Sequence, residues 1–460
     1  MSHNRTTASA VTIDRGLHDW QILQQDAQGQ VGVTLGGRWW TLARRKNPEV
    51  RVRIVREGTY TAISRHQDWI VAATLVDPDV TGEEAGKSGT WSLTLDAIPR
   101  GGPYRLDTLI GSREDALEWR RSGDGIHFFG VGDVWLIAGQ SNAEGTAQNP
   151  IDDPAEIGVH QYGSRGGWQM ATHGSRHHPW LAFAKTLKKE LGYPIGLVPT
   201  AVGGSPMARW DPGQNGDLYQ VMARRIKEAG AGVKGVLWYQ GESDVGPEDH
   251  PRYKARFIRF VTGLRQLAAQ PHLPIITVQL NRRLGEENGP GWEAIREYQR
   301  QLSHDLEQVY IISIFESGLC DVIHNGALGN LLIAQRAADT ALGGVYGRDM
   351  PFRHPECTRA FQVAANTIEL HFRHVVERLD YIGVPTRDFP FAVRDPRGEV
   401  PVAAFTLPDR QTIRFECARA LAGPATITGA PGACPPHLVP RDINGYRGML
   451  AFTLPLEQPA

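Results

Sequence analysis

Cysteine is scarce in this chain, with only four residues among 460. They are Cys320, Cys357, Cys417 and Cys434, and no C-x-x-C spacing occurs, which excludes the common zinc-knuckle and redox motifs. We expect free thiols and a reducing compartment. A single Cys417–Cys434 disulfide is the alternative.

Long apolar runs and a surplus of one charge are also missing. No stretch approaches 18 apolar residues, so no transmembrane helix is predicted. The formal net charge is -1 and no long run of like charge occurs, which gives no support for nucleic-acid or membrane-surface binding. The first ten residues lack the apolar core of a signal peptide. We therefore expect a cytoplasmic protein that binds neither nucleic acid nor membrane. A secreted or particle-associated protein is the alternative, and the oligomeric state is open.

Short β-branched or aromatic runs, separated by glycine and proline, occupy both ends of the chain. Such spacing is typical of β-sandwiches. It predicts an N-terminal β-sandwich-like domain over residues 1–128 and a C-terminal β region over residues 348–460. The C-terminal region either forms a small domain of its own or packs with the N-terminal sandwich. The predicted strands are 31–35, 51–55, 69–75 and 91–95 at one end and 367–372, 412–417 and 448–454 at the other.

The middle of the chain, residues 129–347, alternates between apolar strands and amphipathic helices. This alternation predicts βαβ units and therefore a parallel sheet with helices on both faces. The predicted strands are 131–138, 195–199, 233–239, 275–280 and 309–314, and the predicted helices are 180–191, 218–229, 253–269, 292–306 and 328–342.

Polar blocks follow four of the five predicted strands, where α/β proteins place their active sites. They are Gly139-Gln140-Ser141-Asn142, Gly203-Gly204-Ser205, Gln240-Gly241-Glu242-Ser243-Asp244 and Asp321-Val322-Ile323-His324. A serine in a tight turn before a helix suits a nucleophile. An aspartate three residues before a histidine can accept from its Nδ1–H and leave Nε2 free to take the serine proton. The order serine, aspartate, histidine is that of several α/β hydrolases.

Together these blocks resemble the SGNH hydrolases, and within them the sialate O-acetylesterase and carbohydrate acetylesterase branch, over about residues 132–340. The resemblance implies a flavodoxin-like α/β domain with a five-stranded parallel sheet. It implies Ser141 as nucleophile, His324 as general base and Asp321 as its orienting partner. The oxyanion hole would consist of the backbone N–H groups of Ser141 and Gly204 and the side-chain amide of Gln240. No cofactor or metal is implied.

The substrate implied by this resemblance is an acetylated mono-, oligo- or polysaccharide. The candidate contacts are Arg209, Trp210 and Asn142. Trp210 is a candidate because aromatic faces stack on sugar rings. The other aromatic residues near the rim are Trp168, Tyr219 and Trp292.

Three other functions stay open. The first is a short-chain esterase acting on non-sugar esters, and the second is a catalytically silent carbohydrate-binding module. The third is a glycosidase that uses Glu242 and Asp244 as its carboxylate pair. These two stand only two residues apart on one segment, from which flanking a bond on both faces is awkward. The resemblance implies instead that Glu242 braces the loop by hydrogen bonds rather than reacting.

Three histidines, His173, His177 and His178, stand close together before one predicted helix. Histidine clusters can bind metal, but no further ligand group is recognisable nearby in the sequence. We therefore expect a solvated histidine-rich loop and no metal site.

Overall fold

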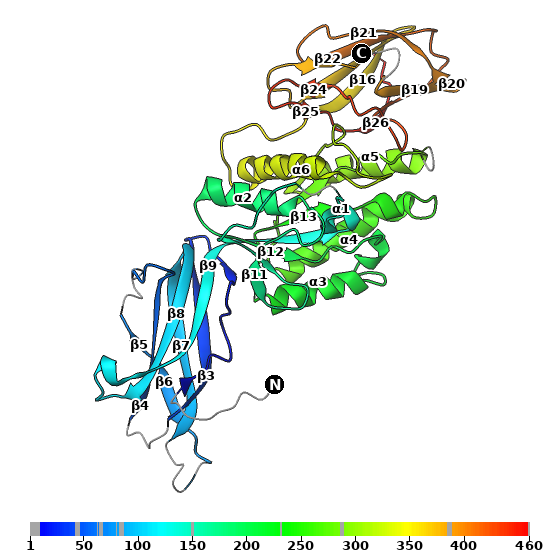
Figure 1. The fold of residues 1–460 in the computed structure, drawn as a ribbon. Coiled ribbons are helices and arrows are strands. Elements are labelled where there is room, and N and C mark those ends of the chain that lie inside the picture. The colour runs from blue at the N-terminus through cyan, green and yellow to red at the C-terminus, as the bar shows by residue number, and fades with distance from the viewer. Residues whose placement is uncertain are drawn as a thin grey trace.

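The chain forms three blocks in a row, which Figure 1 shows from the N-terminal strands at one end to the C-terminal strands at the other. The computed structural model describes residues 10–41, 47–61, 63, 68–79, 81, 87–148, 151–230, 232–285, 289–383 and 389–458. The first nine residues, which include most of the segment searched for a signal peptide, lie outside that range. Among the described residues, no helix is long and apolar enough to cross a membrane.

The N-terminal block contains two groups of paired strands around a core of its own. One group is β1 (Ala10–Val11), β3 (Gln30–Trp40), β7 (Ser88–Pro99) and β6 (Ala73–Val76), in that order. The other contains β5 (Ile70–Val71), β4 (Pro48–Arg56), β8 (Gly101–Ser112), β9 (Arg121–Gly139) and β2 (Ile22–Gln24), with a short turn of helix at Leu117–Trp119. Alternating residues such as Val50, Val52 and Ile54 face this core, as period-two side-chain alternation requires.

Strand β9 continues from this block into the central sheet. Its first part pairs with β8 in antiparallel fashion, and its last part pairs in parallel fashion with β12 (Ile195–Pro199) and β13 (Gly235–Tyr239). The strand therefore crosses the predicted boundary between residues 128 and 129 without a break.

The central sheet has six parallel strands and one antiparallel edge strand, not the five parallel strands predicted. Its order is β11 (Trp168–Met170), β10 (Val159–Tyr162), β12, β9, β13, β14 (Ile275–Val278) and β15 (Val309–Ile312). All five predicted strands are present, in the spatial order second, first, third, fourth, fifth, which is the flavodoxin-like order. The prediction missed β10 and β11, because β10 carries the polar residues His160 and Gln161.

Helices α2 to α6 lie within a few residues of their predicted positions. Helix α2 packs on α6, and α4 packs on α5. The helices are α1 (Ser141–Glu144), α2 (Trp180–Leu191), α3 (Asp217–Glu228), α4 (His250–Leu267), α5 (Gly289–Asp305) and α6 (Ala327–Thr340), with short turns at Met207–Arg209, Glu242–Asp244 and Ala341–Val345. Between them they bury most of the large central core.

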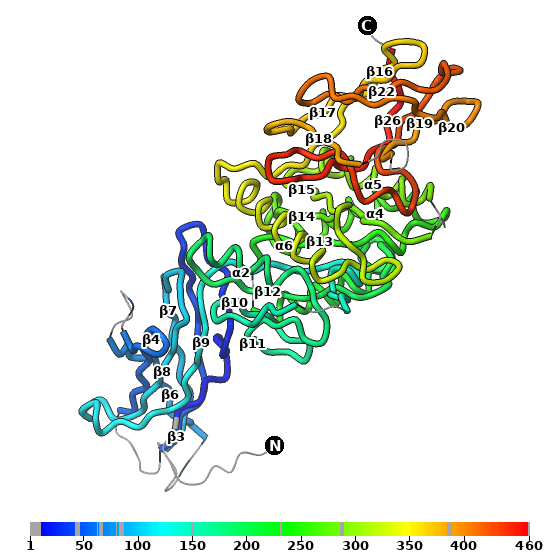
Figure 2. Tube along the Cα trace, turned by 45° about the horizontal axis from the view of Figure 1, so that its top comes forward, coloured from blue at the N-terminus to red at the C-terminus, as the bar shows by residue number. Residues whose placement is uncertain are grey.

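The C-terminal strands form a third core of their own at the far end from the N-terminal strands, as both views show (Figures 1 and 2). Two groups have four strands each: β16 (Glu356–Ala364), β17 (Thr367–Arg373), β22 (Thr412–Cys417) and β21 (Val402–Thr406), and then β20 (Gly398–Val400), β19 (Phe391–Asp395), β23 (Thr426–Gly429) and β26 (Phe452–Pro455). A three-stranded group contains β18 (Leu379–Asp380), β24 (Arg441–Asp442) and β25 (Arg447–Gly448). All four cysteines are free thiols, so Cys417 and Cys434 form no disulfide.

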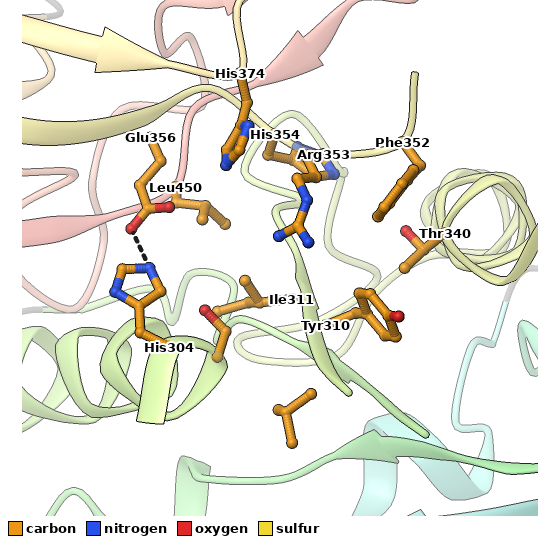
Figure 3. A pocket seen from close by; sticks show the side chains of 12 residues that line it. His304, Tyr310, Ile311, Thr340, Phe352, Arg353, His354, Glu356, His374 and Leu450 are labelled. Carbon is orange, nitrogen blue, oxygen red and sulfur yellow. Dashed lines mark ion pairs between the residues drawn. The ribbon is translucent and has the colours of Figure 1, made fainter. Parts of the chain in front are cut away.

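Ionic contacts join helix α5 to the C-terminal strands. Glu356 receives hydrogen bonds from Arg300 and Arg373 and lies 2.7 Å from His304 Nε2. His304 and Glu356 border a cavity of about 20 Å³, large enough for one water-sized molecule, and Figure 3 shows His304, Glu356, His354 and other side chains around it.

Arg296 of α5 is the most deeply buried cation at this junction, with 1% of its surface exposed. It donates to five backbone carbonyls, two in the central block and three in the C-terminal one. The acceptors are the carbonyl oxygens of Leu280, Asn281, Ala430, Gly432 and Ala433. Burial lowers the pKa of this guanidinium to about 9, so it is still charged at neutral pH.

Replacing Arg296 by methionine should destabilise the protein strongly, because several buried carbonyls would lose their donors at once. Each orphaned group costs about 1–3 kcal/mol, so we expect Arg296→Met to lower the thermal midpoint by roughly 6 °C or more. Arg397→Met, at an exposed turn, is the matched control. Equal midpoints for the two variants would contradict this account of the junction.

Candidate active site

Ser141 is the first residue of helix α1, directly after strand β9. Gly139 ends the strand with φ +123°, and a Cβ there would lie 2.1 Å from the carbonyl oxygen of Tyr239. The next residue, Gln140, donates its N–H to that same oxygen at 2.9 Å. This close approach turns the chain sharply and presents Ser141 at the carboxyl edge of the sheet.

His324 lies between Ser141 and Asp321. Its Nε2 is 2.9 Å from Ser141 Oγ, and its Nδ1 is 2.7 Å from Asp321 Oδ2. The structure therefore brings together these three residues, two from one loop and one from 183 positions earlier. A neutral imidazole with its proton on Nδ1 can accept the serine proton at Nε2.

The carboxylate of Asp321 is held by its own loop. Its Oδ1 accepts from the N–H groups of Ile323 at 2.9 Å and His324 at 2.8 Å. Burial opposes ionisation of Asp321, but these hydrogen bonds and the one from His324 outweigh it and lower the pKa of Asp321 below its ordinary value. Asp321 is thus a stable anion that fixes the orientation of the ring.

Two backbone N–H groups lie free near Ser141. Within the described residues, neither Ser141 N–H nor Gly204 N–H donates to another protein group. Gly204 has φ +64°, and the preceding Gly203 donates to Glu144 Oε2 at 2.8 Å, which ties this loop to helix α1. A Cβ at Gly203 would lie 3.7 Å from Ser141 Cβ. The two free donors suit a developing oxyanion beside the serine.

Gln240 does not supply the third donor that was predicted. Its side chain is fully buried, and its Nε2 donates to Asp244 Oδ2 at 2.5 Å and to the Ser205 carbonyl at 3.1 Å. Both amide protons are therefore used inside the scaffold. Gln240 connects the loop after β13 to the loop after β12.

Asn142 is also a scaffold residue rather than a substrate contact. It is 3% exposed, and its Oδ1 accepts from the Asn325 backbone N–H at 3.1 Å and from Asn325 Nδ2 at 3.0 Å. Its Nδ2 donates to Glu242 Oε1 at 2.8 Å. The amide of Asn142 thus links the nucleophile helix to the residue that follows His324.

Asn325 is the centre of a buried polar network that the sequence did not reveal. Besides its two bonds to Asn142, it donates to the Tyr239 hydroxyl at 3.1 Å. Its Oδ1 accepts from Asn281 Nδ2 at 2.7 Å and from Ser317 Oγ at 3.1 Å. The one sequence signal is the position of Asn325 directly after His324. Glu144, which holds Gly203, gave no signal at all.

Glu242 and Asp244 stand on one short turn and are buried, with 9% and 0% of their surfaces exposed. Burial raises the pKa of Glu242 and raises that of Asp244 to about 6. Asp244 accepts from Met207 N–H as well as from Gln240. Two carboxyl groups on one buried turn cannot flank a glycosidic bond from opposite sides, which disfavours the glycosidase alternative.

The aromatic candidates are core residues. Trp210 is fully buried, packs edge-on against Trp238 and donates its Nε1–H to Ser205 Oγ. The predicted stacking of Trp210 on a sugar is therefore contradicted. Trp168, Tyr219 and Trp292 are buried as well. Arg209 has a side chain that is 38% exposed and pairs with Asp217.

The three histidines do not form a solvated loop. His177 is fully buried and His178 is 8% exposed, and the His173 side chain is 13% exposed. His173 Nε2 lies 2.9 Å from Asp153 Oδ2. The acidic partner that the sequence did not suggest comes from the segment after α1, twenty residues before His173.

Comparison with known proteins bears on the central block. Residues 131–343 match the model of the family described as carbohydrate esterase, sialic acid-specific acetylesterase. The match covers a little under half of the chain and includes Ser141, Asp321 and His324. The resemblance drawn from the four blocks is therefore confirmed.

Two curated relatives match part of the chain. A probable carbohydrate esterase of Arabidopsis thaliana is 40% identical over 109 residues, which is 22% of this chain and 41% of that protein. The sialate O-acetylesterase of Homo sapiens is 26% identical over 212 residues, covering 34% of this chain and 39% of that protein. The chain thus spans about two fifths of the length of these relatives.

One solved structure matches almost the whole chain. It is that of a novel carbohydrate acetylesterase from Xanthomonas citri, with a TM-score of 0.68 and 22% identity, covering 97% of this chain and 99% of that one. This likeness shows that the three-block fold is shared, including both β regions.

Removing the side chain of Asn325 should lower kcat for ester hydrolysis and leave KM nearly unchanged. The network positions the His324 loop and touches no exposed surface, so its loss should misplace the base by a fraction of an ångström. We expect Asn325→Ala to reduce kcat by about 10- to 100-fold. Asn281→Ala removes only one bond to Asn325 and should have a smaller effect. Steady-state kinetics on a short aryl ester tests this, and unchanged kcat in both variants would contradict it.

Glu242→Gln should keep activity and change how stability depends on pH. The folded wild type holds a proton on Glu242 above the ordinary pKa of about 4.3, so its free energy of unfolding should fall relative to the variant as pH rises through the raised pKa. Below about pH 4 the difference should be constant. Urea unfolding from pH 4 to 9 measures it. Loss of catalysis in Glu242→Gln would instead identify Glu242 as a reacting carboxylate.

Proposed function

We propose that this protein is a serine esterase that removes O-acetyl groups from a carbohydrate through an acetyl-serine intermediate. The single observation that carries the proposal is that His324 contacts both partners at once. Its Nε2 lies 2.9 Å from Ser141 Oγ, and its Nδ1 lies 2.7 Å from Asp321 Oδ2. The family match of residues 131–343 supports the acetylated carbohydrate as substrate.

In the proposed mechanism, His324 Nε2 takes the proton of Ser141 as Oγ bonds to the acetyl carbon. The oxyanion accepts hydrogen bonds from the N–H groups of Ser141 and Gly204. The bond from the acetyl carbon to the sugar oxygen then breaks, and that oxygen takes the proton from His324. A water molecule gives its proton to His324 and attacks the acetyl-serine, which releases acetate and restores the Ser141 hydroxyl. Asp321 stays ionised and stabilises the imidazolium in both steps.

Two hollows border residues that lie within three positions of Ser141 or His324 in the chain, and both offer room for a sugar. One, of about 500 Å³, borders helix α1 through Ala143 and Glu144 and extends to Tyr162 and Arg225. The other, of about 580 Å³, borders Gly326 in the loop after His324. Both have polar and apolar lining, as sugar sites do. Arg209 is the one predicted substrate contact whose side chain is partly open, and it stays a proposal.

We propose that the hydrolase segment, residues 129–347, carries the chemistry and that the two β regions, residues 1–128 and 348–460, brace it. The contacts of Arg296 across the C-terminal junction and the passage of β9 across the N-terminal one support a bracing role.

The decisive experiment measures acetate release from a panel of O-acetylated sugars. We expect Ser141→Ala and His324→Ala to lose essentially all activity and Asp321→Asn to lose about 10²- to 10⁴-fold, because the wrong tautomer is then favoured. Variants of Gln240 serve as a comparison, because a loss of activity in them would come from damage to the buried scaffold. Residual turnover in Ser141→Ala would refute the mechanism.

The same panel, extended by aryl acetates and by a sugar-binding assay, separates the remaining functions. Cleavage of aryl acetates but of no acetylated sugar would favour a non-sugar esterase. Sugar binding without acetate release would favour a binding module.

A further inference from the structure

Three potential metal ligands meet beside the nucleophile helix. The donor atoms of Asp153, His173 and His177 all lie within 4.8 Å of one another. His173 and His177 come from the loop between β11 and α2, and Asp153 from the segment after α1. Two imidazoles and one carboxylate form the donor set of many zinc sites.

His177 brings the second observation. Its side chain is fully buried, yet its Nε2 has no hydrogen-bond partner among the described residues. A buried polar nitrogen without a partner is costly, and such groups call for an explanation, for example an ion. The rings of His173 and His177 lie stacked, with their centroids 4.0 Å apart.

The neighbouring His178 takes no part. Its Nδ1 accepts from the Trp180 N–H at 3.2 Å, and its Nε2 donates to the Thr172 carbonyl at 3.2 Å. Both ring nitrogens are therefore occupied by the backbone of the same loop.

We propose that Asp153 Oδ2, His173 Nε2 and His177 Nε2 bind one Zn²⁺ ion. Ligand atoms about 2.0–2.1 Å from a tetrahedral zinc are separated by roughly 3.4 Å. The 2.9 Å between His173 Nε2 and Asp153 Oδ2 must widen slightly, and the ligand atom of His177, which lies within 4.8 Å of the other two, must approach them. His173 also lines the cavity of about 500 Å³.

Binding at Nε2 leaves the proton of each ring on Nδ1. At present His173 Nδ1 accepts from the His178 N–H at 3.2 Å, and Asn330 Nδ2 lies 3.3 Å from His177 Nδ1 while it donates to the His177 carbonyl at 2.9 Å. Zinc binding therefore requires both of these contacts to rearrange.

The ammonium group of Lys185 should weaken the affinity of the site for zinc. Its Nζ lies 2.6 Å from Asp153 Oδ1, the oxygen that does not face His173. An ammonium beside the carboxylate weakens attraction for a divalent cation. If the cluster is only an ion-pair network, Lys185 stabilises it. If it is a zinc site, removing Lys185 tightens binding.

The ion would fix the loop against the catalytic helix. The His177 backbone pairs in both directions with Ala147, and Trp180 Nε1 donates to the Ala143 carbonyl at 2.6 Å. Zinc would thus order one wall of the cavity next to Ser141 without entering the reaction.

The test is isothermal titration of chelator-treated full-length protein with ZnCl₂, together with thermal unfolding. We expect one ion per chain with a dissociation constant of about 10 µM or below. Saturating zinc should raise the thermal midpoint by roughly 3 °C or more. His173→Ala, at a partly open position, should weaken binding at least about tenfold, because one of three ligands is lost.

Two further variants make the outcome unambiguous. Lys185→Met should bind zinc more tightly than the wild type, whereas the surface variant His272→Ala should bind it equally. Wild-type binding weaker than about 1 mM, or unchanged affinity in His173→Ala, would overturn the proposal. Because binding and unfolding need no substrate, either result is independent of the proposed esterase activity.

Discussion

Strand β9 is the constraint on which the rest of the molecule depends. Its residues 129–139 are buried, and it pairs in turn with β8, β2, β12 and β13. The hydrogen bonds of two sheets therefore fix a single continuous backbone, and Ser141, the proposed nucleophile, stands two residues beyond its end. Any displacement of the N-terminal strands relative to the central sheet would have to bend β9 and would move Ser141. Rigid placement of this kind is what a site needs when reacting atoms must be held within a fraction of an ångström.

A second constraint acts across the site. The loops after β9, β13 and β15 are connected by amide side chains, with Asn142 joined to both Glu242 and Asn325. Gln240 joins the loop after β13 to the loop after β12 through Ser205. Buried polar groups stabilise a single arrangement only when each finds its partners, and a partly satisfied network is worse than an apolar core. Here most partners are present, so the four loops hold one geometry together rather than each holding its own.

The sequence predicts the parts of this design that repeat or alternate. Five strands, five helices and the meeting of Ser141, His324 and Asp321 follow from periodicity and from the rule that sites lie at carboxyl strand ends. Strand β10 escaped because His160 is polar, yet it is buried with its Nδ1 2.7 Å from the Trp20 carbonyl, 140 residues away. The role of Gln240 was misjudged because its hydrogen-bond partners come from elsewhere in the fold. Whether an amide proton is free depends on Asp244 and Ser205, and no spacing reveals that the fold has already used it.

The burial of the motif residues indicates where specificity has to come from. Asn142, Gln240, Glu242 and Asp244 are enclosed, so the blocks that identify the family encode a scaffold and a reaction rather than a sugar. Substrate choice must then depend on what lines the hollows outside the motifs. On one side these are β10 with the loop that follows it, the end of β12 and the histidine-bearing loop before α2. These are also the segments that sequence patterns described least well, because a surface that recognises one ligand has no reason to repeat.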